Sequence, residues 1–346
     1  MTVESHVSVF ELFRALLNVS KASANREVLL KRGNQMISML VNRRQALVVS
    51  LALVTLALTI SPPSKPSAIA VVQDSSVEPD QVVKARLQTI VKDILSAWDK
   101  ADVVCLGEGH GNKNDSDLRI TLIQHPDFIR KVNVIIVEFA DSMHQDVLDR
   151  LALDGEDIPR EQLREVWKYT SGKELWELPI YEAFLRAVRK VNLTVPRNQR
   201  VRLIAGDNST EQNRGGFIRE AVSREILDKH LKALAIYGMG HCQCRAMGFP
   251  GELKSKYPGR IWSAFQFHSL KAARQLFGLG DEPKLIPITG TDREKVPAAG
   301  LFDFGRANDS ATLGNITNAI VYYGNLKQGS LPAQPTAEQT IGREPR

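Results

Sequence analysis

Two histidines in this chain each follow an apolar run and a glycine-rich turn. The run 103–106 continues into Gly107-Glu108-Gly109-His110, and the run 233–237 continues into Gly238-Met239-Gly240-His241. An imidazole gains or loses a proton near neutral pH, and a carboxylate such as Glu108 is a suitable partner for it. Glycines let backbone and ligand approach closely. These residues therefore predict a site for proton transfer or ligand binding.

The elements that must position these residues alternate between strands and helices. Apolar runs predict strands over 102–106, 132–139, 201–205, 233–237, 261–265, 285–288 and 319–323. Helical patterns lie between them, over 82–99, 118–129, 143–153, 161–169 and 180–191. This alternation is typical of an α/β fold with a mostly parallel sheet and helices on both faces. We expect the helical insert 143–195 to cap the carboxyl edge of the strands.

Polar groups follow four of the predicted strands. The first strand supplies Glu108 and His110, the second Glu138, the third Asp207 and the fourth His241. The carboxyl ends of parallel strands share one edge, where ligands of open α/β sheets bind. A carboxylate without a partner at the end of a buried strand is costly, so Glu138 should face a partner or a polar cleft. Asp207 fits a helix N-cap or a turn equally well.

Other polar residues near this edge have simpler interpretations. Arg119, one to two turns into the helix after the first strand, either reaches back to a carboxylate or is a solvated surface residue. His144 and Asp141 follow the second strand, and the start of a helix explains Asp141 without any site. His125 precedes Pro126, which indicates a helix end or kink and a structural role for the histidine.

Composition limits the classes of function. The chain has 346 residues, of which 43% are hydrophobic and 24% charged, as in a globular protein. Residues 1–70 hold eight Lys/Arg and three Asp/Glu, so residues 71–346 hold 37 Lys/Arg and 36 Asp/Glu, a net charge of +1. No general attraction to nucleic acid is implied.

The three cysteines, Cys105, Cys242 and Cys244, are an odd number and predict no disulfide framework. Structural zinc sites need a second Cys or His pair beside Cys242-Gln243-Cys244, so we expect these thiols to be incidental.

The amino terminus has the pattern of an export signal. A 15-residue apolar run over 46–60 follows Arg43-Arg44, and Ala68-Ile69-Ala70 is a small-residue cleavage pattern. We expect cleavage near Ala70 and a periplasmic or secreted protein. A spanning helix needs about 20 apolar residues, so an uncleaved membrane anchor is the alternative. Because a charged n-region usually lies near the start, translation is expected to begin at Met36 or Met39.

The expected organisation has three parts. Residues 1–70 are an upstream extension with the signal peptide or anchor, 71–325 are a single α/β domain, and 326–346 are a disordered tail rich in Gln, Pro, Thr and Glu.

The ordered motifs Gly107-Glu108-Gly109-His110, Arg119, Val137-Glu138, Gly206-Asp207 and Tyr237–His241 resemble the erythromycin esterase-like and ChaN–Tiki-like superfamily over about 102–270. The esterase pattern has two residues between Glu and His, whereas one glycine separates them here, as in the ChaN-like haem-uptake branch. The esterase resemblance implies that His110 activates water, that Glu108 and Glu138 orient it or hold a cation, and that Arg119 fixes a carboxylate. His241 would protonate the leaving group or stabilise the oxyanion.

The other branches imply different cofactors. The Tiki-like resemblance implies a divalent metal (Mn, Co or Zn) that generates hydroxide, with His110, His241, Glu108 and Glu138 as ligands. The ChaN-like resemblance implies haem binding without catalysis, with a histidine or Tyr237 on the iron. Asp207, Tyr237 and His144 are expected to contact the small-molecule substrate. The leading prediction is an exported hydrolase of ester or amide bonds, with haem binding as the alternative.

Dinucleotide binding is a minor alternative. A strand, a glycine-rich turn, a helix and a second strand ending in Glu138 imitate a nucleotide-binding βαβ unit. However, Gly107, Gly109 and Gly111 follow G-x-G-x-G, and Glu108 would face the pyrophosphate. The sequence contains no Walker loop, Gly-x-Ser-x-Gly elbow or His-Glu-x-x-His helix, which excludes several common enzyme classes.

Overall fold

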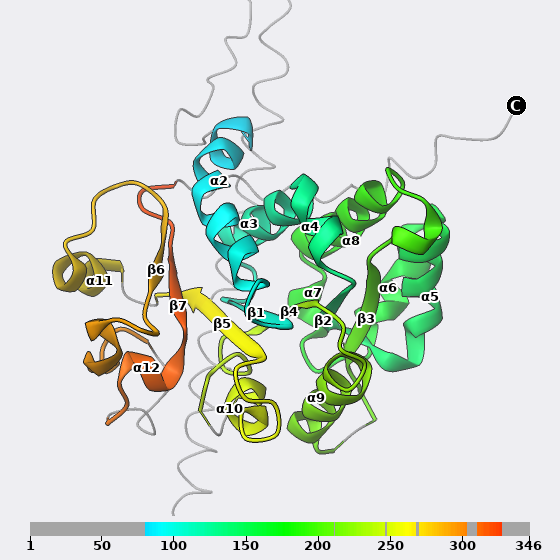
Figure 1. The fold of residues 1–346 in the computed structure, drawn as a ribbon. Helices are drawn as coiled ribbons and strands as arrows, with labels where there is room; N and C mark the ends of the chain where they lie inside the picture. The colour runs from blue at the N-terminus through cyan, green and yellow to red at the C-terminus, as the bar shows by residue number, and fades with distance from the viewer. Residues whose placement is uncertain (1–79, 211, 246–247, 268–269, 303–309, 327–346) are drawn as a thin grey trace, which may run out of the picture. The chain divides into compact units, whose positions relative to one another are not determined.

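Seven strands form one sheet in the computed structural model, which describes residues 80–326 without 211, 246–247, 268–269 and 303–309 (Figure 1). The strand order is β3-β2-β4-β1-β5-β7-β6. The strands are β1 (Val103–Glu108), β2 (Val134–Asp141), β3 (Arg202–Asp207), β4 (Ala233–Gly238), β5 (Ile261–Gln266), β6 (Lys284–Pro287) and β7 (Ala319–Tyr322). All neighbours pair parallel except β6 and β7, which are antiparallel. The predicted α/β fold with a mostly parallel sheet is confirmed.

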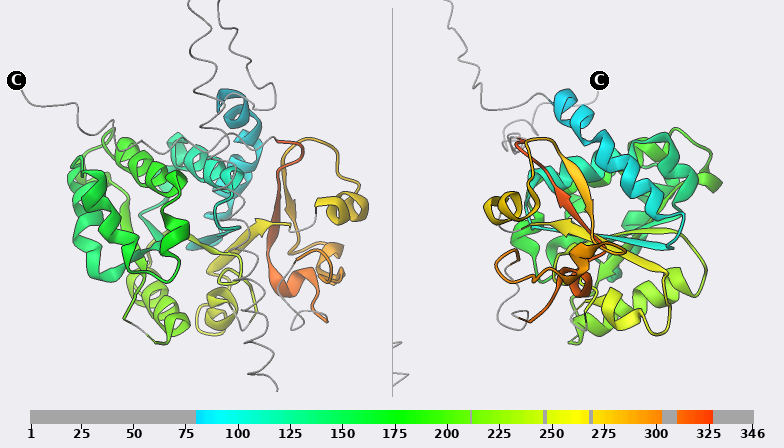
Figure 2. Two further views of the ribbon diagram at one scale, coloured as in Figure 1. Left: turned by 180° about the vertical axis from the view of Figure 1, so that it is seen from behind. Right: turned by 60° about the vertical axis from the view of Figure 1, so that its left-hand side comes forward.

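Helices cover both faces of the sheet (Figure 2). One apolar core packs under α2 (Asp80–Ala97), α3 (Lys113–Ile123), α4 (Pro126–Lys131), α5 (Gln145–Asp149), α6 (Arg160–Lys168), α7 (Lys173–Trp176) and α8 (Pro179–Asn192). A second core packs under α9 (Arg214–Val222), α10 (Phe249–Leu253), α11 (Leu270–Phe277) and α12 (Leu313–Ile316). Alternate side chains of each strand enter opposite cores, which is why the central strands are apolar throughout.

The helices differ in detail from the sequence prediction. The expected helix 118–129 is two helices, because α4 begins at Pro126, which cannot donate a backbone hydrogen bond to a preceding turn. His125 caps α4, with Nδ1 accepting a 3.2 Å hydrogen bond from Asp127 N, a structural role as expected. The stretch 143–153 divides into a 3₁₀ turn (Ser142–His144), α5 and a π turn (Arg150–Asp154). The pattern did not predict the short helices α7, α10 and α12, nor α9 and α11.

A disulfide joins the middle of the sheet to the loop after β4. Cys105 in β1 is bonded to Cys242, with their Cα atoms 5.8 Å apart, whereas Cys244 is a free thiol. The prediction that the odd cysteine count excludes a disulfide is therefore wrong. Because β1 and β4 are neighbours, two cysteines 137 residues apart in sequence come within bonding distance.

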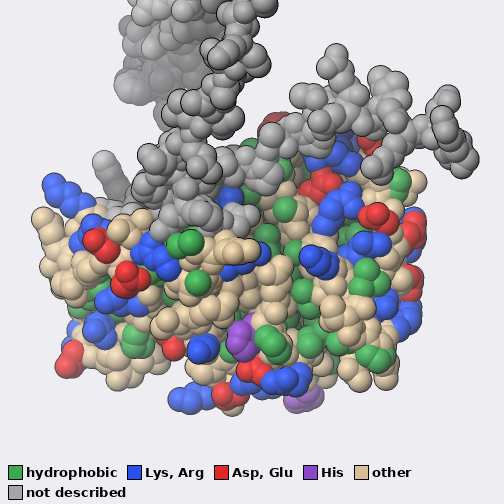
Figure 3. Space-filling model, turned by 90° about the horizontal axis from the view of Figure 1, so that it is seen from above, with side chains coloured by type: hydrophobic (Ala, Val, Ile, Leu, Met, Phe, Trp, Pro, Cys, Tyr) green, Lys and Arg blue, Asp and Glu red, His purple; other side chains and the backbone are tan. Residues whose placement is uncertain are grey.

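The predicted signal segment and the tail beyond Leu326 lie outside the described residues. Among the helices that are described, none combines the length and the apolar character needed to cross a membrane. Seen from above, the described surface mixes Lys and Arg side chains with acidic and apolar ones (Figure 3). Positive and negative side chains thus lie interspersed on this face.

Candidate functional site

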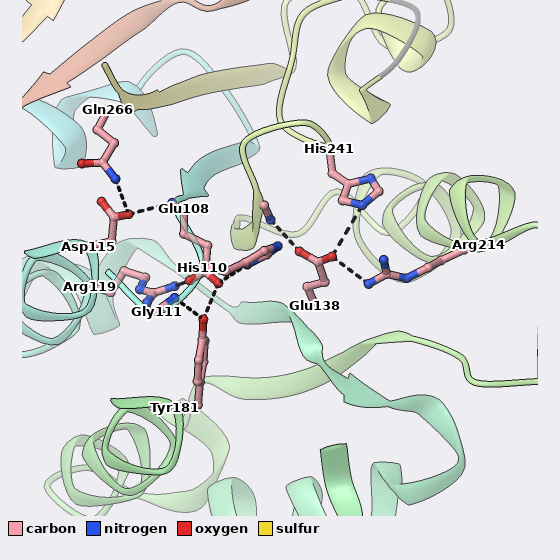
Figure 4. Close-up of polar contacts among 12 residues, drawn as sticks. Glu108, His110, Gly111, Asp115, Arg119, Glu138, Tyr181, Arg214, His241 and Gln266 are labelled. Atoms are coloured by element: carbon pink, nitrogen blue, oxygen red, sulfur yellow. Dashed lines mark hydrogen bonds and ion pairs between the residues drawn. The ribbon is translucent and has the colours of Figure 1, made fainter. Parts of the chain in front are cut away.

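The carboxyl ends of β1, β2, β3 and β4 lie along one edge of the sheet, and the predicted polar side chains meet there (Figure 4). Glu108 and His110 come from the end of β1, Glu138 from β2 and His241 from the turn after β4. Both histidine side chains are about one third exposed, at 33% and 31%, whereas both glutamates are buried. The edge thus presents two imidazoles to solvent above buried carboxylates.

Glu108 is the partner of His110. Its Oε1 lies 2.8 Å from His110 Nδ1 and also accepts a 2.9 Å hydrogen bond from the Tyr181 hydroxyl in α8. Its Oε2 pairs with the guanidinium of Arg119 in α3, which is buried. The predicted reach of Arg119 back to a carboxylate is confirmed. Arg119 therefore holds the partner of His110 and does not face solvent.

These contacts fix the charge states of the pair. Burial alone would raise the pKa of Glu108, but the Arg119 charge and the His110 hydrogen bond outweigh it and lower the pKa to about 2. Burial lowers the pKa of His110, but the hydrogen bond to Glu108 and the charges of Glu138 and Glu108 prevail, so the pKa is raised. An ionised Glu108 only accepts, so His110 Nδ1 is the donor and Nε2 is directed to the site.

The space around His110 Nε2 is narrow. The Trp176 ring in α7 lies edge-on to the imidazole, with ring centroids 4.9 Å apart. On the other side, a Cβ at Gly238 would lie 2.8 Å from Nε2 and 3.4 Å from Glu138 Oε2. Because Gly238 has no side chain, His110 and Glu138 can face each other across it. Trp176 of α7 and Tyr181 of α8 bring part of the insert to the His110 turn, whereas α5, α6 and most of α8 pack on one face of the sheet.

Glu138 links the second histidine to the sheet. Its Oε2 accepts a 2.5 Å hydrogen bond from Gly238 N, and its Oε1 lies 2.7 Å from Arg214 Nη2 and 3.5 Å from His241 Nε2. The pairing of β2 with β3 shifts register between Val137 and Asp141, so Glu138 lies where the regular pairing is interrupted. Bulges commonly redirect a side chain next to a site.

His241 has the opposite electrostatic setting to His110. Burial is the largest influence and lowers the pKa of His241, with the Arg214 charge acting in the same direction against the attraction of Glu138. At neutral pH His241 is therefore mostly neutral, while His110 more readily carries a proton. Two imidazoles whose pKa values are shifted in opposite directions share one edge.

A buried carboxylate supports the turn that carries His110. Asp115 Oδ2 accepts hydrogen bonds from Gly109 N at 2.9 Å and from Gln266 Nε2 at 3.1 Å, and Oδ1 accepts one of 2.6 Å from the Tyr323 hydroxyl. Burial is the main reason that the pKa of Asp115 is raised to about 6. This group ties the glycine-rich turn to β5 and β7.

Three residues expected at the substrate have other surroundings. Asp207 is 1% exposed and accepts a 2.8 Å hydrogen bond from Arg214 Nε, so it positions that arginine. Tyr237 is fully buried and its hydroxyl donates to Gly206 O over 3.1 Å, which leaves it no access to a substrate or to iron. His144 stacks on Tyr169, with ring centroids 6.1 Å apart. Direct contact of Asp207 or Tyr237 with a ligand is inconsistent with their burial.

The residues present do not fit the predicted metal set. Among the described residues, no group of three or more His, Cys, Asp or Glu is arranged to hold a metal ion. The physical reason is that both carboxylates have other partners. Glu108 is bound by Arg119 and Tyr181, and Glu138 by Arg214 and the Gly238 amide.

Sequence reasoning missed four residues of this site: Asp115, Trp176, Tyr181 and Arg214. Asp115 lies just before the predicted helix 118–129, where an acidic residue needs no further explanation. Trp176 and Tyr181 have the spacing of core residues, and only the folded position of the insert brings them to His110. Arg214 follows Asp207 by seven residues, and this proximity of opposite charges was the one available signal.

Fold and site together define an α/β protein with a histidine and carboxylate site at the carboxyl edge of its sheet. Residues 94–214 match the family described as "Haem-binding uptake, Tiki superfamily, ChaN". The chain therefore resembles the ChaN–Tiki superfamily, as its motifs predict. The matched segment contains Glu108, His110, Arg119 and Glu138, ends at Arg214 and leaves His241 outside. Comparison with curated protein sequences finds no match.

Three solved structures show a distant likeness. A crystal structure of a Bacillus cereus protein aligns at a TM-score of 0.48 and 10% identity, over 71% of this chain and 97% of that one. The structure described as cofacial heme binding to ChaN of Campylobacter jejuni aligns at a TM-score of 0.34 and 15% identity, over 52% of this chain and 85% of that one. The structure of the type III effector HopBA1 aligns at a TM-score of 0.31 and 14% identity, over 52% of this chain and 81% of that one. At these TM-scores the three likenesses carry no conclusion on function.

Proposed function

We propose that the strand-end site is the active site of a hydrolase, in which His110 and His241 act as acid and base on an ester or amide bond. One observation carries the proposal: two partly exposed imidazoles face the same carboxylate, Glu138, and their pKa values are shifted in opposite directions. Environments that push two titratable groups apart in pKa are typical of an acid and base pair.

The charge states suggest the order of proton transfers. Neutral His241 takes a proton from water as the oxygen attacks the substrate carbonyl carbon. Protonated His110 then donates its Nε2 proton to the leaving oxygen or nitrogen. Glu108, held by Arg119 and Tyr181, keeps Nε2 directed to the substrate. These roles are the reverse of those implied by the esterase resemblance, which makes His110 the base.

The experiment compares two esters of the same acid, 4-nitrophenyl butyrate and ethyl butyrate. Nitrophenolate leaves without a proton, whereas ethoxide requires one. We expect His110→Gln to lose far more activity on the ethyl ester than on the nitrophenyl ester, and His241→Gln to lose activity on both alike. The control is His230→Asn, because His230 is exposed and has a φ of 54°, which asparagine tolerates. Unchanged hydrolysis in both His110→Gln and His241→Gln would exclude this function.

Haem binding is the second candidate, because the matched family is described as haem-binding. The insert that contacts His110 exposes Met143, Tyr169 and Leu175, at 65%, 54% and 41%, which suits an apolar macrocycle. His110 Nε2 would be the axial ligand. Its raised pKa opposes this, because a protonated imidazole cannot bind iron. Titration with haemin tests it: a stoichiometric Soret shift that His110→Ala abolishes, in a protein without hydrolytic activity, would favour haem.

Export is proposed together with this function. It rests on the signal-peptide pattern over 43–70, and the buried Cys105–Cys242 disulfide suits an oxidising compartment. Amino-terminal sequencing of the mature protein from cell fractions tests it. A start near residue 71 outside the cytoplasm is expected, and an intact segment 43–70 in the membrane fraction would indicate the anchor instead.

A further inference from the structure

All three cysteines of the chain lie close together, around the middle of β1 and the turn that carries His241. Cys105 of β1 is in register with Ser263 of β5. The sulfur of Cys244 lies 3.3 Å from the Ser263 hydroxyl. Neighbouring strands are about 4.8 Å apart, and paired residues of parallel strands project to the same side. The Cys244 thiol is therefore about one side-chain position away from the Cys105–Cys242 disulfide.

The three sulfur atoms differ in access. Cys105 and Cys242 are fully buried, so a dissolved thiol has no direct path to their bond. Cys244 is partly exposed and lines a surface cavity of about 620 Å³ beside Lys254, Asn315 and Asn318. Burial of its sulfur raises the pKa of the Cys244 thiol, so exchange is expected to be faster at alkaline pH. Of the three cysteines, Cys244 is therefore the one that is partly exposed, and it also contacts Ser263, the strand neighbour of Cys105.

We propose that the Cys244 thiol exchanges with the buried Cys105–Cys242 disulfide, because it lies beside the strand neighbour of Cys105. The Cys244 thiolate attacks Cys105 Sγ, a Cys105–Cys244 bond forms, the Cys105–Cys242 bond breaks, and the electron pair leaves on Cys242 Sγ as a thiolate. One thiolate and one disulfide are present before and after the step, so it needs no external oxidant or reductant. Some backbone movement of the loop accompanies it, since bonded cysteines need Cα atoms within about 7 Å.

The exchange would move the cross-link away from the site. Cys242 directly follows His241, so the existing bond anchors the His241 turn to β1, where Glu108 and His110 also begin. After exchange the anchor lies two residues further along, at Cys244. The covalent restraint on His241 is then weaker, and the partly exposed Cys244 has become part of the disulfide. The position of the disulfide within the cysteine cluster thereby controls how firmly the His241 turn is held.

Trapping experiments on the full chain test the exchange. The protein, purified without reductant, is held at about pH 8, where thiolate forms more readily, and is trapped over time with N-ethylmaleimide in acidic denaturant. Peptide mapping then shows which cysteine carries the maleimide. We expect the label on Cys242 to rise with time in the wild type, and no such rise in Cys244→Ser. A label confined to Cys244 at every time would overturn the proposal.

A second variant tests the reach of Cys244 alone. In a glutathione redox buffer, Cys242→Ser should form a Cys105–Cys244 disulfide, while the matched Cys244→Ser keeps Cys105–Cys242. Circular dichroism establishes that each variant is folded. A folded Cys242→Ser protein that keeps Cys105 and Cys244 as two thiols contradicts the proposal. If Cys242→Ser does not fold, the trapping of the wild type decides.

Discussion

The Tyr181 hydroxyl donates a 2.9 Å hydrogen bond to Glu108 Oε1 and joins α8 to the end of β1 across 73 residues of sequence. The hydroxyl oxygen of Tyr181 in turn accepts a 3.0 Å hydrogen bond from Gly111 N. Glu108 and Gly111 flank His110 on either side. Tyr181 thus holds the segment 108–111, which carries His110, at both ends. The position of His110 therefore depends on how α8 packs.

Tyr181→Phe should therefore loosen the His110 turn without emptying the core. The ring stays in place, but the Gly111 amide loses its acceptor and Glu108 loses one donor. We expect a loss of about 1–2 kcal/mol in the free energy of unfolding, measured by urea denaturation. Tyr169→Phe is the control, because Tyr169 is 54% exposed. Equal stability of the two variants would show that the Tyr181 hydroxyl is not needed.

Glu108→Gln should damage the fold as well as the site. Glu108 neutralises the buried Arg119, and removing one member of a buried ion pair typically costs about 3–5 kcal/mol. Urea denaturation should show a loss of this size. Adding Arg119→Met removes the unpaired charge and should restore part of the stability. A single variant as stable as the wild type would mean that Arg119 finds another partner.

The sequence allowed the sheet and its edge to be predicted, because buried parallel strands are apolar throughout and parallel strand ends share an edge. All seven predicted strands occur, and Glu108, His110, Glu138 and His241 meet as that rule requires. The order of the strands was not predictable from local pattern. Knowledge that β1 and β4 are neighbours was needed to foresee the Cys105–Cys242 bond.

The supporting contacts could not be predicted for a related reason. Only tertiary packing brings Trp176 to His110 and Tyr181 to Glu108 and Gly111, and the apolar spacing of Trp176 and Tyr181 indicates a core role alone. Asp207 was expected to contact substrate because it ends a strand, but it is buried and its Oδ1 binds Arg214. The sequence pattern predicts which residues lie at the edge of the sheet. Whether such a side chain faces solvent depends on the side chains that bind it in the folded protein.

The raised pKa of Asp115 predicts a dependence of stability on pH. Its pKa is about 6 in the folded protein against an ordinary 3.8, so the folded state binds more protons between these values. Stability from this group is therefore lost as pH rises from about 4 to 6, by roughly 3 kcal/mol. Urea midpoints of wild type and Asp115→Asn across this range isolate the effect. A constant difference between the two proteins would contradict the raised pKa.

The two histidines predict the shape of the pH–rate profile if the site is a hydrolase. The value of kcat/KM should rise as His241 loses its proton, below the ordinary imidazole pKa of 6.5, and fall as His110 loses its proton above that value. The profile on ethyl butyrate measures both limbs. His241→Gln should remove the acid limb and His110→Gln the alkaline limb from the residual activity. Persistence of both limbs in either variant would assign them to other groups.

Gly238 offers a test of the geometry between His110 and Glu138 that changes no charge. A Cβ there would lie 2.8 Å from His110 Nε2, so alanine must displace the imidazole from its place opposite Glu138. His110 is partly exposed and can move, so we expect little change in the unfolding midpoint. Displacement of about 1 Å should nevertheless lower kcat/KM by roughly 10- to 100-fold.

The matched control for Gly238→Ala is Gly240→Ala, two residues along the same turn. Gly240 is exposed, and a Cβ there meets nothing within 4 Å. This variant should keep both the activity and the stability of the wild type. Equal activity of the two alanine variants would show that hydrolysis does not require His110 to face Glu138. A loss confined to Gly238→Ala would connect activity to that arrangement, because both variants add the same methyl group to the turn that leads to His241.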